Sequence, residues 1–374
     1  MRRLFKIFPN TRLRAQMVKE LLSILRDPRS RLVVFLPPLM QLFIFAFATT
    51  LEVRNADIAV HDRDAGRWSH EFVARVAAAD FVNEVHTVHS RDELRALIDE
   101  RKVIAAIDMG PDFSRDIAAG RPATVQVIVD GRRSNAGQIT VAYLNTIAAD
   151  VGAAARRDTR DATPIVVRNW FNPNLIYRWF VVPALSGILV FFSGLMITAL
   201  SIARERELGT FDQLLVSPTT TTEIIIAKAV PALAIGTVLG LLMIAAATFG
   251  FGVPLEGSFW LLLPSLELFI LSVVGIGLMI SSVCATQQQA ILGTFAIGVP
   301  AVLMSGFATP VENMPTVLQW MAQGIPLTHF LILVEGTFLK AMPLSDIIAN
   351  TWPLAVIALV TLSMAVIFVR SRLQ

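Results

Sequence analysis

Long apolar runs recur along this chain, separated by shorter polar stretches. A helix rises about 1.5 Å per residue, so crossing about 30 Å of hydrocarbon takes roughly 20 apolar residues. Six segments fit this length, although the fifth is short: residues 32–51, 178–201, 224–249, 259–282, 290–307 and 347–369. The pattern predicts an α-helical membrane protein with six transmembrane helices.

Residues 52–177 show a different pattern and hold most of the acidic residues of the chain. Four short runs rich in Val and Ile predict strands, and they alternate with helical patterns. The strands cover residues 57–61, 85–88, 103–108 and 125–130, and the helices cover 67–79, 91–101, 112–119 and 134–158. This alternation predicts a small α/β domain, inserted between helices one and two.

The first 31 residues are rich in Lys and Arg, with Glu20 and Asp27 as their only acids. Such a cluster can bind nucleic acid, but beside an apolar segment the positive-inside rule explains it more simply. We therefore expect a cytoplasmic N-terminus and contact with membrane lipid, but no nucleic-acid partner. Six crossings return the C-terminus to the same side, in agreement with Arg370 and Arg372. Residues 52–177 then lie in the periplasm of a bacterial inner-membrane protein.

A cleaved signal peptide is the alternative for the first span, because Ala46-Phe47-Ala48 resembles a cleavage site. The leader is too long for this reading, since the basic region of a signal peptide is usually brief, and Pro37-Pro38 interrupts the apolar run. An uncleaved span is favoured. Before it, residues 12–26 place apolar side chains on one stripe, which predicts an amphipathic helix in the membrane interface.

Composition agrees with a lipid environment, because 54% of the 374 residues are hydrophobic and 16% are charged, against roughly 25% charged in soluble domains. The single cysteine, Cys284, allows neither an internal disulfide nor a cysteine zinc site. His61, His70, His86 and His89 all lie in the α/β block. Residues three apart on a strand point to opposite faces, so we expect His86 and His89 to form no metal site.

The segment after the second span carries the most distinctive motif. A charged run at residues 204–207 leads to Gly209-Thr210, and an amphipathic turn ending at Pro218 follows. Thr219–Thr222 supply caps for the next helix. The segment could be a rigid, two-faced element that inserts its apolar face into a cleft on a cytoplasmic partner. An ordinary solvated loop is the alternative.

This segment resembles the coupling motif of type-2 ABC-transporter permeases, which reads charged residues, Gly-Thr, an acid, Leu-Leu and Ser/Thr-Pro. Other stretches resemble the same family in the same order: residues 19–21, 26–29, 171–173, 179–183, 286–290, 304–307 and 326–330. The resemblance covers the whole chain; it is specific in the membrane half and weak in residues 57–160. The large block after the first span is similar to the drug-exporter branch of the family.

The resemblance implies the permease subunit of an ATP-driven ABC exporter. Its substrate is expected to be amphiphilic, such as a drug, an organic cation or a lipid-like molecule, taken from the cytoplasm or the inner leaflet. The implied partners are an ATP-binding cassette ATPase subunit, a second permease subunit in a homodimer or heterodimer, and a periplasmic adaptor. The implied ATPase-docking residues are Glu205, Gly209, Thr210, Asp212, Leu214, Leu215 and Pro218.

The chain itself is not expected to be an enzyme. It contains no Gly-x-x-x-x-Gly-Lys-Ser/Thr loop, whose backbone amides cradle the phosphates of a nucleotide. We therefore expect ATP and magnesium on the partner ATPase and no cofactor on this chain.

These patterns divide the chain into four parts. The parts are a cytoplasmic leader (1–31), the first transmembrane helix (32–51), the periplasmic α/β domain (52–177) and a five-helix transmembrane domain (178–374). The last part contains the coupling segment 202–222 and an outer re-entrant region, 308–346.

A few polar or small residues lie inside the predicted spans. Glu267 is deep in the fourth span, where it could attract a cationic substrate or form a hydrogen bond between helices. Lys228 lies near the start of the third span and is expected to snorkel to the cytoplasmic surface. Gly275 and Gly277 are expected to allow close helix packing rather than to line a path.

Other classes of protein fit the pattern less well. An ion-gradient-driven secondary transporter predicts internal repeats and intramembrane acids, but no convincing repeat is present and only Glu267 is deep. A periplasmic sensor needs fewer spans. A membrane enzyme needs a nucleophile with its base or a metal cluster, and we identify neither in the sequence.

Overall fold

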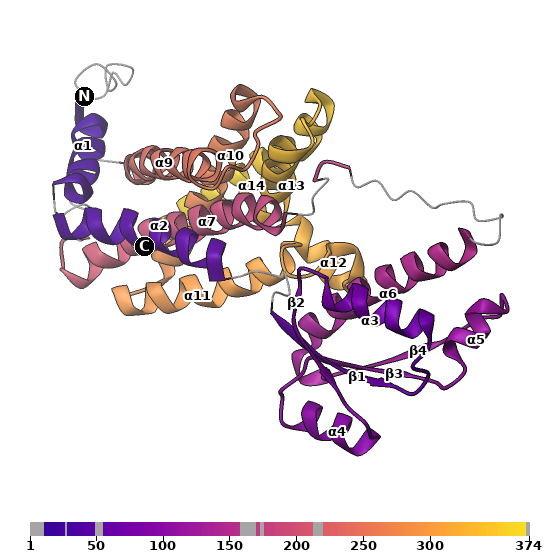
Figure 1. Ribbon diagram of the computed structural model, residues 1–374. Coiled ribbons are helices and arrows are strands. Elements are labelled where there is room, and N and C mark those ends of the chain that lie inside the picture. Colours follow the sequence, from indigo (N-terminus) through magenta and orange to yellow (C-terminus); the bar gives the residue numbers. More distant parts are fainter. Residues whose placement is uncertain are drawn as a thin grey trace. The chain divides into compact units, whose positions relative to one another are not determined.

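The computed structural model describes residues 11–26, 28–48, 55–157, 170–172, 176–211 and 220–371. The chain folds into two compact units, which we call the helical unit (residues 1–48 and 170–374) and the α/β unit (residues 49–169). Figure 1 shows the helices of the first unit and the twisted sheet of the second. Each unit has its own hydrophobic core.

The helical unit contains long apolar helices connected by short segments. Its elements are α1 (Thr11–Leu25), α2 (Pro28–Ala48), α7 (Tyr177–Glu207), α9 (Thr221–Ala245), the π-helical turn η3 (Ala246–Gly250), α10 (Phe259–Val283), α11 (Gln287–Met304), the 3-10 turn η4 (Val311–Asn313), α12 (Thr316–Gln323), α13 (Pro326–Leu339) and α14 (Leu344–Ser371). Four helices among the described residues, namely α7, α9 with η3, α10 and α14, are long and apolar enough to cross a membrane. The chain is therefore a multi-pass membrane protein.

These four helices coincide with four of the six predicted spans. The other two predicted spans correspond to α2, whose apolar part is the shorter stretch Val34–Phe47, and to α11, which has 18 residues. A total of six crossings stays a prediction. The helix α7 continues beyond the predicted end of its span to Glu207, so the charged run is the last part of a transmembrane helix.

The predicted outer re-entrant region, residues 308–346, contains an abrupt bend. Helices α12 and α13 together are apolar enough to span, but they meet at an angle of 78°. A broken span and a re-entrant loop both have this geometry. The bent pair raises the number of crossings to five if it counts as one span.

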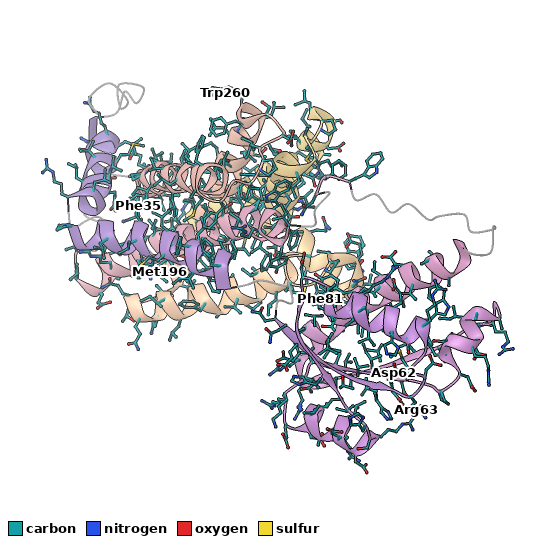
Figure 2. The ribbon with its side chains drawn as sticks, viewed as in Figure 1. Phe35, Asp62, Arg63, Phe81, Met196 and Trp260 are labelled. Atoms are coloured by element: carbon teal, nitrogen blue, oxygen red, sulfur yellow. The ribbon has the colours of Figure 1, made fainter. Side chains whose placement is uncertain are left out.

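Helix α10 packs against α7 and α14 in the helical unit (Figure 1). Side chains fill the space between these helices (Figure 2). A Cβ added to Gly277 would overlap Oγ1 of Thr198 on α7, and one added to Gly275 would overlap Oγ1 of Thr361 on α14. The prediction that both glycines permit close helix packing is confirmed.

The α/β unit has a four-stranded sheet with strand order β2-β1-β3-β4. Strand β1 pairs in parallel with β2 and β3, whereas β3 and β4 are antiparallel. The strands are β1 (Ala56–Asp62), β2 (Val82–Thr87), β3 (Ala105–Met109) and β4 (Val125–Val129). The other elements are α3 (Arg67–Ala77), α4 (Arg91–Asp99), α5 (Phe113–Ala118), the 3-10 turn η2 (Gly131–Arg133) and α6 (Ser134–Arg157).

The two faces of this sheet are covered unequally. On one face, α3 and α6 place Phe72 and Leu144 against Ile58 and Ile107 in the main core of the unit. On the other face, the short helix α4 covers a smaller cluster built around Leu94. This second face also carries polar residues, because alternate strand positions point to it.

Candidate coupling site at the carboxyl end of α7

A glycine cap ends α7 directly after its charged run. Gly209 has a φ of 69°, a left-handed conformation that glycine adopts without a Cβ penalty. The Thr210 amide donates to the Glu205 carbonyl at 2.9 Å, and the Gly209 amide donates to the Arg206 carbonyl at 3.0 Å. These two bonds form a Schellman motif, which fixes the direction in which the chain leaves the helix.

Two side chains of the last turn fasten α7 to neighbouring helix ends. The Arg206 guanidinium donates to the carbonyl oxygens of Ser282 at 2.8 Å and Cys284 at 3.2 Å. A positive charge is favourable at this carboxyl end of α10, because the helix dipole is negative there. Oε2 of Glu207 accepts the amide of Gln287, the first residue of α11, at 2.7 Å. Helices α7, α10 and α11 are thereby joined at one end.

Phe211 folds back onto the helices after the glycine cap. Its side chain is buried in the core of the helical unit, and the Arg206 guanidinium lies over its ring, 5.0 Å from the centroid. At the other end of the segment, Thr220 caps α9 through a capping box, since its hydroxyl accepts the Glu223 amide at 3.3 Å. The chain is therefore anchored on both sides of residues 212–219.

A buried ion network joins α7 to α9 and α1. Nζ of Lys228 lies 2.8 Å from Oε2 of Glu205 and 3.0 Å from Oε1 of Glu20. It also donates to the Ser201 hydroxyl at 3.1 Å, and Lys19 lies 3.3 Å from Oε1 of Glu205. The Lys228 side chain is only 2% exposed, so the prediction that it snorkels to the surface is wrong. It is neutralised by carboxylates inside the protein.

The amphipathic helix α1 reaches this network through its apolar stripe. Leu13 and Met17 are buried against Ala227 of α9, and Lys19 and Glu20 on the same helix join the ion pairs. We expected the stripe of α1 to face the acyl boundary of the membrane, but this part of it packs on protein. Helix α1 therefore packs on α9 and contacts the end of α7 through Lys19.

The structure places three of the predicted docking residues and leaves the others undescribed. Glu205 is buried, Thr210 is half-buried and Gly209 is exposed. The remaining four, Asp212, Leu214, Leu215 and Pro218, lie outside the described residues. The sequence reasoning missed the partners of Glu205. Lys228 is an ionisable residue in an otherwise apolar helix, and such residues usually pair with another polar group, so this position was the available signal for the ion network.

Glu267 is half-buried within α10. The Thr237 hydroxyl of α9 donates to its Oε1 at 2.8 Å. This contact corresponds to the second of the two roles considered for Glu267, a hydrogen bond between helices. A place on a substrate path stays a prediction.

One group of side chains in the α/β unit could approach a metal ion. Ligand atoms of Asp57, Glu84 and His86 lie within 4.8 Å of one another. Asn83 donates to Asp57 at 2.8 Å and His86 lies 3.8 Å from Glu84, so the cluster is satisfied by protein contacts. It is also partly exposed, and we assign no metal to it.

The site and the fold together define the class. A bundle of apolar helices carries a capped, charged element, and that element is bound to α1, α9, α10 and α11. Such an arrangement connects the end of α7 to several other helices of the unit.

The family model for the ABC-2 family transporter protein matches residues 30–367. The chain belongs to the ABC-2 transporter family, and its role is that of an ABC transporter permease rather than an enzyme. This match confirms the predicted class of protein, a permease that works with an ATPase subunit. Nothing supports an ion-gradient-driven transporter.

Three relatives from Escherichia coli K12 illustrate the match. The probable multidrug ABC transporter permease YbhR is 41% identical over 362 residues, covering 95% of this chain and 97% of that protein. The probable multidrug ABC transporter permease YbhS is 30% identical over 335 residues, which is 88% of each chain. The inner membrane transport permease YhhJ is 30% identical over 326 residues, covering 85% and 86% respectively.

Proposed function

We propose that this permease is the membrane half of an ATP-driven exporter whose ATPase docks on the coupling segment, residues 202–222. The exporter moves an amphiphilic substrate, such as a drug, organic cation or lipid-like molecule, out of the cytoplasm or inner leaflet. Two relatives are named as probable multidrug permeases, which supports this substrate class. ATP and magnesium belong to the ATPase.

The proposal rests on one observation: the described residues on either side of residues 212–219 are held in place by the helical unit. Before them, the Schellman motif and the buried Phe211 hold the chain against α7. After them, the capping box at Thr220 begins α9. A force applied to the segment by a docked ATPase would therefore act on α7 and α9 through these two flanking contacts.

We assign different roles to the proposed docking residues. Glu205 is engaged by Lys228 and Lys19 within the chain, so we assign it to holding α7 against α9 and α1. Gly209 and Thr210 set the direction of the segment. Direct contact with the ATPase falls to Asp212, Leu214, Leu215 and Pro218.

The orientation follows from charge. Basic residues at both ends of the chain place the termini in the cytoplasm, with the coupling segment on the same side. The protein then lies in the inner membrane with six crossings, counting α2 and α11. The α/β unit lies in the periplasm as an inserted domain, where an adaptor protein can bind it. A second permease subunit completes the transport path.

Co-purification with the candidate ATPase tests the docking assignment. Replacing Leu214 and Leu215 by Ser should abolish complex formation and ATP-dependent substrate transport in proteoliposomes. The matched control is Leu344→Ser, which changes an exposed leucine at the start of α14 on the proposed outer side and should preserve both. If the double variant still binds the ATPase and transports, the docking assignment is wrong. Transport by this chain without nucleotide or ATPase would contradict the whole proposal.

A further inference from the structure

The unequally covered sheet of the α/β unit leaves a cavity beside α4. Its volume is about 330 Å³, at the lower end of the range for small-molecule sites. Leu94 and Ile98 of α4 and Ile128 of β4 supply apolar walls. Ile128 is 37% exposed, so the cavity has an apolar surface that the fold itself does not cover.

Two arginines and one carboxylate line the same cavity. Arg91 and Arg95 lie one helical turn apart on α4, and with Asp108 as the single acid in the lining the cations are in excess. Like charges at this spacing destabilise a helix by a few tenths of a kcal/mol. Their side chains are 67% and 82% exposed. The acidic neighbour of Arg95 is Asp99 at 3.7 Å, itself 69% exposed, and such a pair is weak in water.

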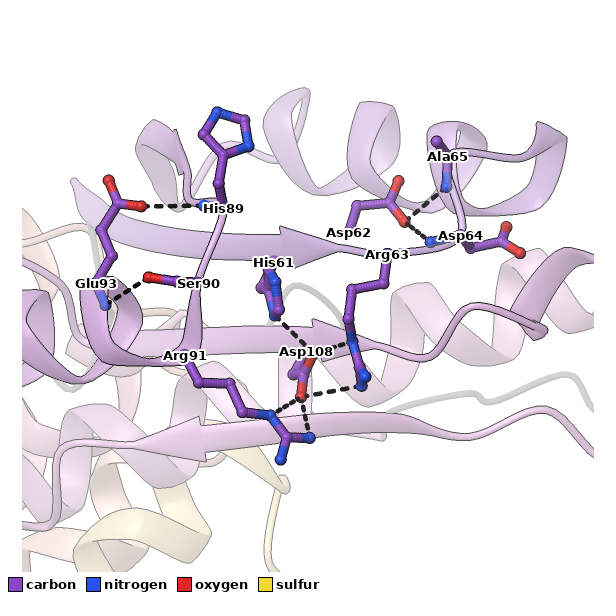
Figure 3. Close-up of polar contacts among 10 residues, drawn as sticks. All are labelled: His61, Asp62, Arg63, Asp64, Ala65, His89, Ser90, Arg91, Glu93 and Asp108. Atoms are coloured by element: carbon purple, nitrogen blue, oxygen red, sulfur yellow. Dashed lines mark hydrogen bonds and ion pairs between the residues drawn. The ribbon is translucent and has the colours of Figure 1, made fainter.

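Arg91 is held in a fixed position by a buried carboxylate. Asp108 is 2% exposed and accepts Nε and Nη2 of Arg91 at 3.0 Å and 2.7 Å, which leaves Nη1 outside this ion pair. Arg63 and His61 contact the same carboxylate at 3.3 Å and 3.0 Å (Figure 3). These contacts hold the pKa of Asp108 low, so it stays charged and keeps the guanidinium in place.

The fixed guanidinium of Arg91 and the apolar walls of the cavity together indicate what kind of ligand can bind there. Arginine binds carboxylate and phosphate groups through parallel N–H donors, and the walls favour an apolar body. We propose that this cavity binds an amphiphilic anion, a molecule with one carboxylate or phosphate head and a short apolar chain. The proposal does not depend on ATPase docking or on the transport substrate.

Calorimetric titration of the full chain in nanodiscs of zwitterionic lipid tests the site, with hexyl phosphate as the probe. Arg95→Gln and Arg91→Gln should each weaken binding about tenfold, because each removes a charge-assisted hydrogen bond. Arg115→Gln is the matched control, since Arg115 is equally exposed and pairs with Asp112 away from the cavity. Equal binding by the Arg91 and Arg95 variants and wild type would overturn the proposal.

Two variants of opposite charge at one position separate an effect on binding from an effect on folding. Ile128→Glu should abolish hexyl phosphate binding, whereas Ile128→Lys should retain it, although both add a polar group at the same exposed site. Hexyltrimethylammonium should not displace hexyl phosphate, and inorganic phosphate should bind far more weakly than hexyl phosphate. Displacement by the cation would contradict the charge part of the assignment, and equal binding of inorganic phosphate would contradict the apolar part.

Lipid composition distinguishes two sources of the anion. If an anionic lipid occupies the cavity, nanodiscs containing phosphatidylglycerol should weaken hexyl phosphate binding by competition. If the natural ligand is a soluble amphiphile, the affinity should be the same in both nanodiscs. Either result supports an anion site and assigns its source.

Discussion

Lys228 and Glu205 form an ion pair of 2.8 Å between Nζ and Oε2, and their side chains are only 2% and 11% exposed. The pair joins α9 to the last turns of α7, directly before the glycine cap. Taking two charges out of water is costly, and the attraction between them offsets that cost only while both partners are present. The network that includes Glu20 and Lys19 therefore acts as one unit.

Removing Lys228 alone should strongly destabilise the helical unit. Lys228→Met leaves two carboxylates without their shared cation, which should lower stability by about 3–5 kcal/mol. Glu205→Gln in the same chain should recover part of that loss, because the two changes act on one interaction. Thermal unfolding in detergent measures both effects. Lys102→Met, which breaks an exposed pair with Glu100, is the control, and strictly additive losses would refute the coupling.

Replacing Gly209 by Ala should weaken both the end of α7 and the binding of the ATPase. The left-handed backbone costs a residue with a Cβ about 1–2 kcal/mol, and among the described residues no atom stands within 4 Å of the added Cβ, so we expect backbone strain to cause the effect. Gly252→Ala is the matched control, with a φ of 65° and the same open space. Both variants should lose similar stability, but only Gly209→Ala should reduce ATPase co-purification. If the ATPase co-purifies equally well with both variants, the glycine cap at Gly209 has no part in ATPase binding.

Gly277→Ala should disrupt the packing of α10 on α7. Overfilled positions typically cost about 1–3 kcal/mol, and the added Cβ would meet the Thr198 hydroxyl. Thr198→Ala in the same chain should relieve part of the clash. Gly152→Ala in α6 has open space and should stabilise its helix by about 0.5–1 kcal/mol. Thermal melting curves in detergent measure these changes in stability. If Gly277→Ala melts like the wild type, α10 and α7 are not in contact at this position.

Glu267→Gln should separate the two roles considered for this residue. The amide oxygen of Gln can still accept the Thr237 hydroxyl, so the contact between α9 and α10 survives while the charge is lost. We expect unchanged stability and unchanged transport in proteoliposomes supplied with the ATPase. A selective loss of cationic substrates, with neutral ones still transported, would instead place Glu267 on the substrate path.

The α/β unit should lose stability in acid through Asp108. Burial by itself raises the pKa of this carboxyl, but the Arg91 hydrogen bond and the charges of Arg63 and Arg91 outweigh burial and hold the pKa below its ordinary value of 3.8. A lowered folded-state pKa contributes stability that is complete above the unfolded value and is lost as pH falls through the folded one. The loss therefore occurs below about pH 4.

Hydrogen exchange of residues 104–110 in the full chain, followed from pH 6 to pH 3, measures this contribution. Wild-type protection should fall steeply at the acid end, and Asp108→Asn should show a flatter profile from a lower starting stability. Asp112→Asn, on the exposed surface, should keep the wild-type slope. Parallel profiles for wild type and Asp108→Asn would contradict the assignment.

Local sequence patterns determined much of this protein. Apolar length predicted α7, α9, α10 and α14, because lipid requires helices whose backbone bonds are satisfied internally. Val- and Ile-rich runs predicted the strands, with β2 shifted by a few residues from its expected place. The motif around Gly209 indicated the family, because charged residues, Gly-Thr, an acid, Leu-Leu and Ser-Pro follow one another in the family's order.

Tertiary structure alone decided which charges meet. Lys228 and Glu20 are far apart in the sequence, and nothing in either neighbourhood shows that they form an ion network with Glu205. The same holds for Asp108, which collects Arg91, Arg63 and His61 from separate elements of the α/β unit. Periodicity along a chain reports burial one segment at a time, whereas ion pairs and cavities depend on where different segments pack together. The sequence therefore determined the family and the four long membrane helices, and the packing decided how the ends of α7 and α9 on either side of the proposed coupling segment are held.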